Sequence, residues 1–332
     1  MYNFIVYTRE DKIALGEMHV KKEFKGALLV IIAAFFWGIS ATAAKFILND
    51  HINPFRLVNM RLNLAFLFLF IFFLIFDRQK LKITKQDAKH LAVLGVCGIV
   101  GVQSTYYFTV STLNVSMAIF LQYLAPAMVV IYSAIFLKEK LSVTILTALG
   151  ISIMGSVLII FGLGGATLAG LNVMGLITGL MSAFFLSFYT IYGKLCTSRI
   201  NAWTVLLYAL GFGALTYWFV SPPWVLWRGI ELKQLGYASY LAVFATIIPF
   251  GLYFNGLRFL TPSSGSIISM LEPVVASLSA YLLLQEKMTL LQILGAMLII
   301  LAVFIINIYY MKKESSNNMQ QSPNNTQQSC EQ

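Results

Sequence analysis

The 332-residue chain is too apolar for a water-soluble globular protein. Its residues are 59% hydrophobic and 11% charged, and its mean hydropathy is +0.80, whereas soluble domains carry about 25% charged residues. The formal net charge of +10 does not indicate a nucleic-acid partner, because the basic residues stand between long apolar segments and suit contact with anionic lipid.

Ten apolar segments are each long enough to cross the hydrocarbon core of a bilayer, which takes about 20 helical residues. In chain order they cover residues 26–48, 55–76, 91–111, 114–137, 142–162, 174–195, 202–221, 237–257, 262–284 and 289–311. The segment 1–25 contains no apolar run typical of a cleaved signal, and Met18 is a second candidate start. The tail, residues 312–332, is rich in Ser, Asn and Gln and is predicted to be disordered. We therefore predict an all-α polytopic membrane protein with ten transmembrane helices.

The sequence between residues 26 and 311 is one unit written twice. It reads LAPAMVVIYSAIFLKEKL around Pro126 and LEPVVASLSAYLLLQEKM around Pro273. The pairs that recur at an offset of 147 residues are Leu124/Leu271, Pro126/Pro273, Leu137/Leu284, Glu139/Glu286, Lys140/Lys287, Ser116/Ser263 and Tyr106/Tyr253. Such self-similarity predicts two copies of one structural unit, which we place at residues 26–162 and 174–311.

The distribution of Lys and Arg predicts that both termini face the cytoplasm. With the N-terminus inside, seventeen basic residues fall on the cytoplasmic side and six on the outer side, as the positive-inside rule requires. Each unit contributes five helices, an odd number, so the second unit enters the membrane from the opposite face. Inverted repeats of this kind are common in secondary transporters, although internal duplication also occurs in channels.

Neither the cysteines nor the glycines carry a recognisable cofactor motif. Cys97, Cys196 and Cys330 show no CxxC or Cys/His spacing, which argues against a disulfide framework and a metal site. The glycines at 162–165 are not followed by the Lys-Ser/Thr of a phosphate-binding loop, so nucleotide hydrolysis is not indicated. We expect no cofactor.

The ordered set of motifs resembles the EamA-type branch of the drug/metabolite transporter superfamily. It consists of FWGIS in the first segment, the paired LxP…EK segments and the LEPV run, and the resemblance covers about residues 24–311. The resemblance implies a ten-helix inner-membrane carrier with a central cavity between its halves. Such carriers commonly export amino acids, metabolites or toxic small molecules, and no motif in this chain identifies the cargo.

Glu272 is the foremost candidate for a functional side chain. It lies about ten residues into the segment 262–284, roughly 15 Å deep at 1.5 Å per residue. An ionised carboxylate at that depth costs several kcal/mol unless it is paired, hydrated or protonated. A continuous helix would gather small and polar residues on one face, namely Gly265, Ser269, Glu272, Ala276 and Ser279. Glu272 is expected to bind a substrate amine or carry a proton; the alternative is a protonated acid hydrogen-bonded to a neighbouring helix.

Pro126 and Pro273 each remove a backbone donor inside a span and free a carbonyl one turn earlier. In transporters such helix breaks often lie at the substrate site. Both prolines are therefore predicted to break their helices beside the cavity, and a packing kink without a ligand role is the alternative. Pro249, which stands opposite Val102 in the repeat, is expected to bend only its own helix.

Aromatic and amide side chains supply the remaining candidates. The predicted lining residues are Trp37, Tyr106, Gln122, Tyr189, Tyr253 and Ser269. Tyrosine and tryptophan combine an apolar body with a polar tip and so suit amphipathic solutes, but they also form interfacial belts or pack between helices. Arg56 and Arg61 are expected to extend towards the outer interface, with a gate or an anion-attracting vestibule as the alternative. Glu139 and Glu286 are expected to be solvated caps or links between the halves.

Together these features predict a secondary transporter that moves small organic solutes across the cytoplasmic membrane by alternating access, with export as the expected direction. An importer or a passive channel of the same fold is the alternative. An intramembrane enzyme is disfavoured because His19, His51 and His90 all lie outside the apolar segments. The expected partners are a small-molecule substrate, the lipid bilayer and protons as a candidate coupling ion. A monomer and a homodimer both remain open.

Overall fold

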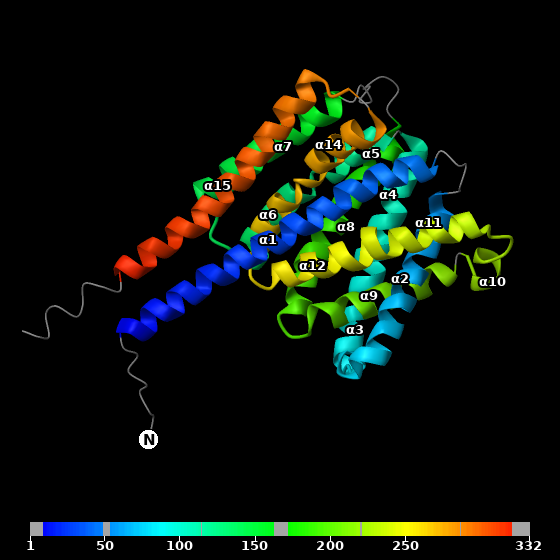
Figure 1. Ribbon diagram of the computed structural model, residues 1–332, viewed down its shortest axis with the longest axis horizontal. Helices are drawn as coiled ribbons and strands as arrows, with labels where there is room; N and C mark the ends of the chain where they lie inside the picture. Colours follow the sequence, from blue (N-terminus) through cyan, green and yellow to red (C-terminus); the bar gives the residue numbers. More distant parts are fainter. Residues whose placement is uncertain are drawn as a thin grey trace, which may run out of the picture.

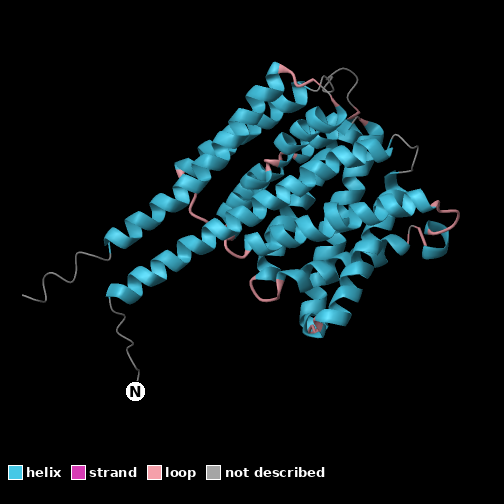
Figure 2. Ribbon diagram, viewed as in Figure 1, coloured by secondary structure: helices cyan, strands magenta, loops and turns pink. Residues whose placement is uncertain are grey.

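The computed structural model describes residues 9–48, 54–113, 115–162, 172–219, 221–285 and 287–320. These residues form helices joined by short connections, with no strand among them (Figure 2). The helices are α1 (Arg9–Leu48), α2 (Pro54–Phe76), α3 (Lys85–Val93), α4 (Gly101–Thr112), α5 (Val115–Gln122), α6 (Ala125–Phe136), α7 (Val143–Gly162), α8 (Val173–Thr197), α9 (Ala202–Trp218), α10 (Pro223–Leu226), α11 (Leu232–Ala242), α12 (Ile248–Leu257), α13 (Pro262–Ser269), α14 (Glu272–Leu284) and α15 (Leu290–Gln320), with the 3-10 turn η1 (Arg78–Leu81) and the π-helical segments η2 (Leu94–Val100) and η3 (Val243–Ile247).

Nine helical segments within the described ranges are long and apolar enough to cross a membrane. They are Lys22–Ala43, Arg56–Phe76, Lys85–Thr112, Met117–Phe136, Val143–Gly162, Val173–Thr197, Leu232–Leu257, Pro262–Leu284 and Leu290–Tyr309. The segment predicted at 202–221 forms the shorter apolar helix α9, of 17 residues. Helices suit this environment because they satisfy their backbone hydrogen bonds internally where water is absent. The chain is a multi-pass membrane protein.

Two spans are interrupted at equivalent points of the sequence repeat. α5 ends at Gln122 and α6 begins at Ala125, while α13 ends at Ser269 and α14 begins at Glu272. In each case the proline is the second residue of the following helix, where its missing N–H breaks no helical bond. The predicted continuous face from Gly265 to Ser279 is therefore wrong, because the interruption lies within it.

Two further backbone irregularities recur in both halves of the sequence. Lys138 and Gln285 both adopt the left-handed conformation, with φ of 51° and 56°. The π-helical segments η2 and η3 occur at matching places in their spans, where η2 joins α3 to α4 and η3 joins α11 to α12. π-Helical turns are rare in proteins, and those that occur are often found at functional sites.

α7 and α15 lie side by side along one edge of the molecule (Figure 1). Their backbones meet at Gly155 and Gly295: a Cβ on Gly155 would lie 2.6 Å from the carbonyl oxygen of Gly295. Small residues permit such close helix approach. The first turn of α1 and the last turn of α15 lie at the same end of the molecule (Figure 1).

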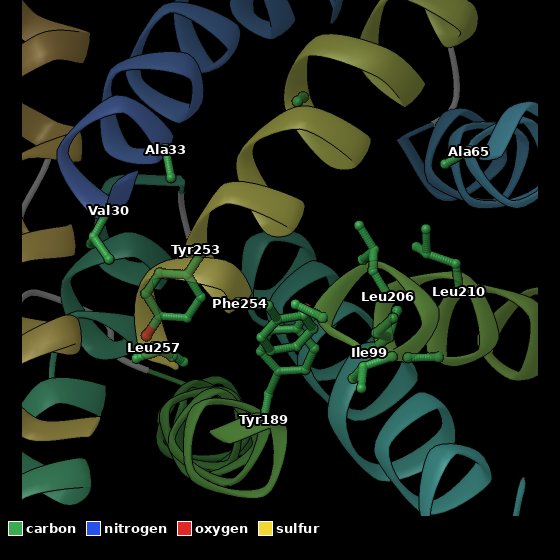
Figure 3. Packing of buried hydrophobic residues seen from close by; sticks show 14 of the residues in the cluster. Val30, Ala33, Ala65, Ile99, Tyr189, Leu206, Leu210, Tyr253, Phe254 and Leu257 are labelled. Atoms are coloured by element: carbon green, nitrogen blue, oxygen red, sulfur yellow. The ribbon is translucent and has the colours of Figure 1, made fainter. Parts of the chain in front are cut away.

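The core joins helices from both halves of the sequence. Phe254 of α12 is fully buried, and its ring lies 5.0 Å from the ring of Tyr189 of α8 and 6.3 Å from that of Tyr253 (Figure 3). Gly193 provides the space for this ring, because a Cβ there would overlap Phe254. α1 packs against both α12 and α14, which brings Gly38 against the backbone of Glu272. This packing surrounds the interrupted helices with rigid neighbours.

Candidate functional site

A cavity of about 290 Å³ lies beside the interrupted helices. α1, α2, α4, α5 and α6 line it from the first half of the sequence, and α8, α11, α12, α13 and α14 from the second. Of the residues predicted from sequence, those that line it are Trp37, Tyr106, Gln122, Pro126, Tyr189, Tyr253, Ser269 and Glu272. Pro273 is buried and is not among the lining residues. The volume is close to the lower end of the range for small-molecule sites, about 300–1,000 Å³.

Glu272 forms an acidic pole on the cavity wall. It is the first residue of α14, and the interruption before it removes the preceding helical turn. Tyr106 of α4 and Tyr123, which follows α5, lie close enough to interact electrostatically with its carboxylate. The residues described here give this carboxylate neither an ion-pair partner nor a hydrogen bond to a neighbouring helix. Because Glu272 lines the cavity, it can meet a bound solute or exchange a proton.

Arg61 forms a basic pole on α2. It lines the main cavity and also a smaller adjoining hollow of about 40 Å³. Tyr107 and Tyr217 lie within range of its charge. The expectation that Arg61 extends to the outer interface was wrong: the residue follows Pro54 by seven positions, about 10 Å along the helix axis. Arg56, near the helix start, instead donates hydrogen bonds to the carbonyl oxygens of Leu226 and Arg228.

An aromatic cluster covers another part of the wall. The Trp37 ring lies 5.0 Å from Phe250 and 5.4 Å from Tyr253, and the Phe250 ring lies 5.7 Å from Tyr189 at an interplanar angle of 90°. The hydroxyls of Tyr253 and Thr190 are 3.2 Å apart. Edge-to-face contacts of this kind fix the ring orientations, so the wall presents a shaped apolar surface.

Hydrogen bonds hold the other predicted polar residues in place. Gln122 donates from Nε2 to the Ser182 hydroxyl on α8 at 2.9 Å. Ser269 donates to the carbonyl oxygen of Ser266 at 2.7 Å. Gln122 therefore links the interrupted helix of the first half to a helix of the second, and its carbonyl oxygen remains as an acceptor.

Three polar atoms on lining residues are buried and lack a hydrogen-bond partner in the described part of the chain. They are Ser40 Oγ, Arg61 Nε and Tyr189 Oη. Buried polar groups in proteins are nearly always paired with protein, water or ligand. These three atoms are themselves out of reach of the cavity's contents, so they mark polar groups that are unpaired behind its wall.

Sequence reasoning missed Ser40, Thr190, Phe250 and Ser266 as lining residues. Ser40, Phe250 and Ser266 carried a signal, because each lies three residues from a predicted residue, namely Trp37, Tyr253 and Ser269, and so shares its helix face. Thr190 directly follows Tyr189 on α8 and also lines the cavity, where its hydroxyl contacts that of Tyr253.

Glu139 joins the two halves away from the cavity. The Ser263 hydroxyl, at the start of α13, donates to Glu139 Oε2 at 2.9 Å. Glu139 Oε1 is buried and has no hydrogen-bond partner among the described residues. The contact agrees with the expectation of a link between halves, although a hydroxyl takes the place of a basic residue. Glu286 lies outside the described residues.

The sequence model of the EamA-like transporter family matches the chain twice, at residues 24–161 and 173–308. An uncharacterized inner membrane transporter, YicL of Salmonella typhimurium, is 30% identical over 291 residues, which is 86% of this chain and 95% of that protein. An uncharacterized transporter of Archaeoglobus fulgidus is 24% identical, over 84% of this chain and 97% of its own length. YoaV of Bacillus subtilis, also an uncharacterized transporter, is 25% identical over 84% and 96% of the two chains.

A solved crystal structure superposes on this fold with a TM-score of 0.70 at 16% identity, covering 86% of this chain and 98% of that one. The family match and the relatives named as transporters indicate a membrane transporter rather than an enzyme. The chain belongs to the EamA-like transporter family.

Proposed function

We propose that this protein is a secondary transporter that moves small organic solutes across the cytoplasmic membrane by alternating access, with export as its direction. The observation that carries the proposal is the cavity of about 290 Å³, whose wall is built from both sequence halves at their helix interruptions. A site shared between two repeat units can be exposed to either face when the units exchange conformations. An importer or a passive channel of the same architecture is the second candidate.

Ten transmembrane helices in two inverted five-helix repeats are part of this proposal, with units at 26–162 and 174–311. Three observations support the arrangement: the family matches twice, the interruptions and left-handed residues share one spacing, and helix contacts come in corresponding pairs. α1 packs on α12 and α14. The proposed counterpart of α1 is α8, and α8 packs in the same way on α4 and α6, the counterparts of α12 and α14. α7 and α15, the last helices of the two units and each other's counterparts, pack against one another.

Both termini are proposed to face the cytoplasm. The charge asymmetry of 17 to six basic residues supports this orientation. Under it, the lining residues at 37–41 of α1 and 57–61 of α2 belong to the outer half of the membrane. The contact between Glu139 and Ser263 then belongs to the cytoplasmic side. The conformation of the structure is then the outward-facing one. On the cytoplasmic side of the cavity it is closed by packing that includes the contact between Glu139 and Ser263.

Proton coupling through Glu272 is the proposed energy source. An acid that faces the cavity without a protein partner can exchange its proton with solute or water on either side. The other groups that face it are the hydroxyls of Tyr106 and Tyr123, with Arg61 elsewhere on the same wall. Arg61 keeps its charge over the physiological range, so Glu272 is the lining residue whose charge changes during the cycle.

The test compares efflux of a metabolite panel from cells with and without the protein, followed by counterflow of each hit in proteoliposomes. We expect saturable counterflow, and the Glu272→Gln variant should lose its dependence on the proton gradient. Glu231→Gln, at an exposed acid before α11, is the matched control. Flux that rises linearly with solute concentration would identify a channel. An unchanged rate and pH dependence in Glu272→Gln would remove Glu272 from the coupling mechanism.

A further inference from the structure

Arg61 carries a charge that the described protein residues leave uncompensated. Its Nε atom is buried and has no hydrogen-bond partner among them, and no described carboxylate lies within ion-pair distance of its guanidinium. Arg61 is only partly buried and lines the cavity, and a cation that is partly removed from water is stabilised by pairing with an anion. Arg56 on the same helix shows the usual solution, since it donates to two backbone carbonyl oxygens.

The described residues around Arg61 include no acidic side chain that pairs with it, and two spaces large enough for other atoms lie beside it. Arg61 and Gln103 line both the main cavity and the smaller hollow. Tyr107 and Tyr217 are the tyrosines within range of its charge, and the Tyr217 hydroxyl already lies 3.1 Å from the hydroxyl of Ser104. The acid on the cavity wall, Glu272, interacts with a different pair of tyrosines. Arg61 therefore places a positive charge on the cavity wall, apart from the acidic side of that wall at Glu272.

Resting on the transport function proposed above, we propose that Arg61 binds the carboxylate of the transported solute, so that the cargo is an organic acid with an apolar or aromatic body. A guanidinium matches a carboxylate with two parallel hydrogen bonds. The body of the solute then contacts the aromatic cluster of Trp37, Phe250 and Tyr189. A phosphate group is disfavoured because it needs several donors, whereas Arg61 is the one basic side chain on the cavity wall within the part of the chain that the structure describes.

Glu272 divides the candidate acids into two groups. When its carboxylate is ionised, it adds a favourable contact for an amine and an unfavourable one for a second acidic group. An amino acid places a cation and an anion at opposite poles, whereas a simple carboxylic acid uses Arg61 alone. Both groups share the carboxylate at Arg61, and the experiment below separates them.

The experiment measures thermal stabilisation of the purified full-length protein in detergent by four compounds. 3-Phenylpropanoate and phenylalanine carry a carboxylate, while 3-phenylpropanamide and phenylalaninamide replace it with an amide. We expect both acids, or phenylalanine alone, to stabilise the wild-type protein, and both amides to be at least tenfold weaker in apparent affinity. Stabilisation by phenylalanine alone would indicate that the amine also contacts Glu272.

The variants Arg61→Gln and Arg61→Lys test the residue itself. Arg61→Gln should weaken the response to the acids at least tenfold and leave the response to the amides unchanged, and Arg61→Lys should retain part of the response. Arg56→Gln is the control, because that residue binds backbone carbonyls and does not line the cavity. If Arg61→Gln does not fold, the comparison of acids with amides on the wild type decides the question.

Equal responses to acids and amides, or no response to either acid, would overturn the inference. Counterflow in proteoliposomes distinguishes this failure from failure of the proposed function. Saturable exchange of uncharged or cationic solutes, without exchange of carboxylates, would leave the transporter proposal standing and remove the role of Arg61. No saturable exchange of any solute by correctly folded protein would contradict the transporter proposal itself.

Discussion

Gly155 of α7 is the position where one added methyl group should disturb the fold most directly. A Cβ there would lie 2.6 Å from the Gly295 carbonyl oxygen and 2.8 Å from Ile299 Cγ1, whereas ordinary contacts begin at 3.4 Å. Moving from 2.6 Å to 3.4 Å requires α7 and α15 to separate by about 0.8 Å, and overpacking of this kind costs about 1–3 kcal/mol. Gly155→Ala is therefore expected to destabilise the protein.

Gly150 on the same helix provides the matched control. A Cβ there would have nothing within 4 Å. Both substitutions gain about 0.5–1 kcal/mol from replacing glycine with alanine inside a helix. Gly150→Ala should therefore be slightly stabilising, and Gly155→Ala should be less stable than Gly150→Ala by the whole overpacking cost, about 1–3 kcal/mol.

Thermal unfolding of the purified variants, followed by tryptophan fluorescence in detergent, measures this difference. In soluble proteins of comparable size 1 kcal/mol corresponds to about 2–4 °C in Tm, so the two variants should differ by at least 2 °C. If Gly155→Ala unfolds at the same temperature as Gly150→Ala, the close contact between α7 and α15 is refuted.

Three further substitutions test the site. Gln122→Leu removes the donor to Ser182 and should lower the unfolding free energy by about 1 kcal/mol; an unchanged Tm would contradict that hydrogen bond. Tyr189→Phe removes a buried hydroxyl that has no partner among the described residues, so Tm should rise, in keeping with a cost of about 1 kcal/mol or more for such a group; a lower Tm would show that the hydroxyl is hydrogen-bonded in the folded protein. Ser263→Ala removes the donor to Glu139 and should increase labelling of the cavity from the cytoplasmic face; unaltered labelling would show that this contact does not hold the face closed.

Composition and the internal repeat were sufficient to predict a helical membrane protein. The lipid environment leaves helices as the main way to satisfy the backbone, so apolar length alone predicts most spans. The segment at 202–221 shows the limit of this rule, because α9 has only 17 residues and is apolar enough but short. Pro126 and Pro273 correctly marked the interrupted spans, since a proline in mid-span cannot donate a helical hydrogen bond.

The detail of the interruptions was not available from the sequence. Treating 262–284 as one helix placed Glu272 in the middle of a continuous face, whereas the structure places it at the start of α14. The π-helical segments η2 and η3 have no composition that distinguishes them from ordinary helix. They depend on how the whole bundle packs, which a local pattern does not contain.

Arg61 shows why local rules misplace a side chain that lines the cavity. A basic residue near the predicted end of a span usually reaches the interface, and Arg56 does remain at that end. Arg61 lies about one and a half turns further along α2, where the cavity replaces lipid beside the helix. Only the packing of α2 against helices of both halves reveals which of the two arginines faces that space.

Labelling of a single cysteine at Ser269, in a protein lacking Cys97, Cys196 and Cys330, tests alternating access most directly. A charged, membrane-impermeant thiol reagent is applied separately to each face of sealed vesicles, with and without the Glu139→Gln substitution. We predict that the substitution raises the labelling rate from the cytoplasmic face and lowers it from the outer face, because one cavity is shared between two exclusive states. Labelling that rises from both faces together, or occurs from one face under all conditions, would contradict the mechanism.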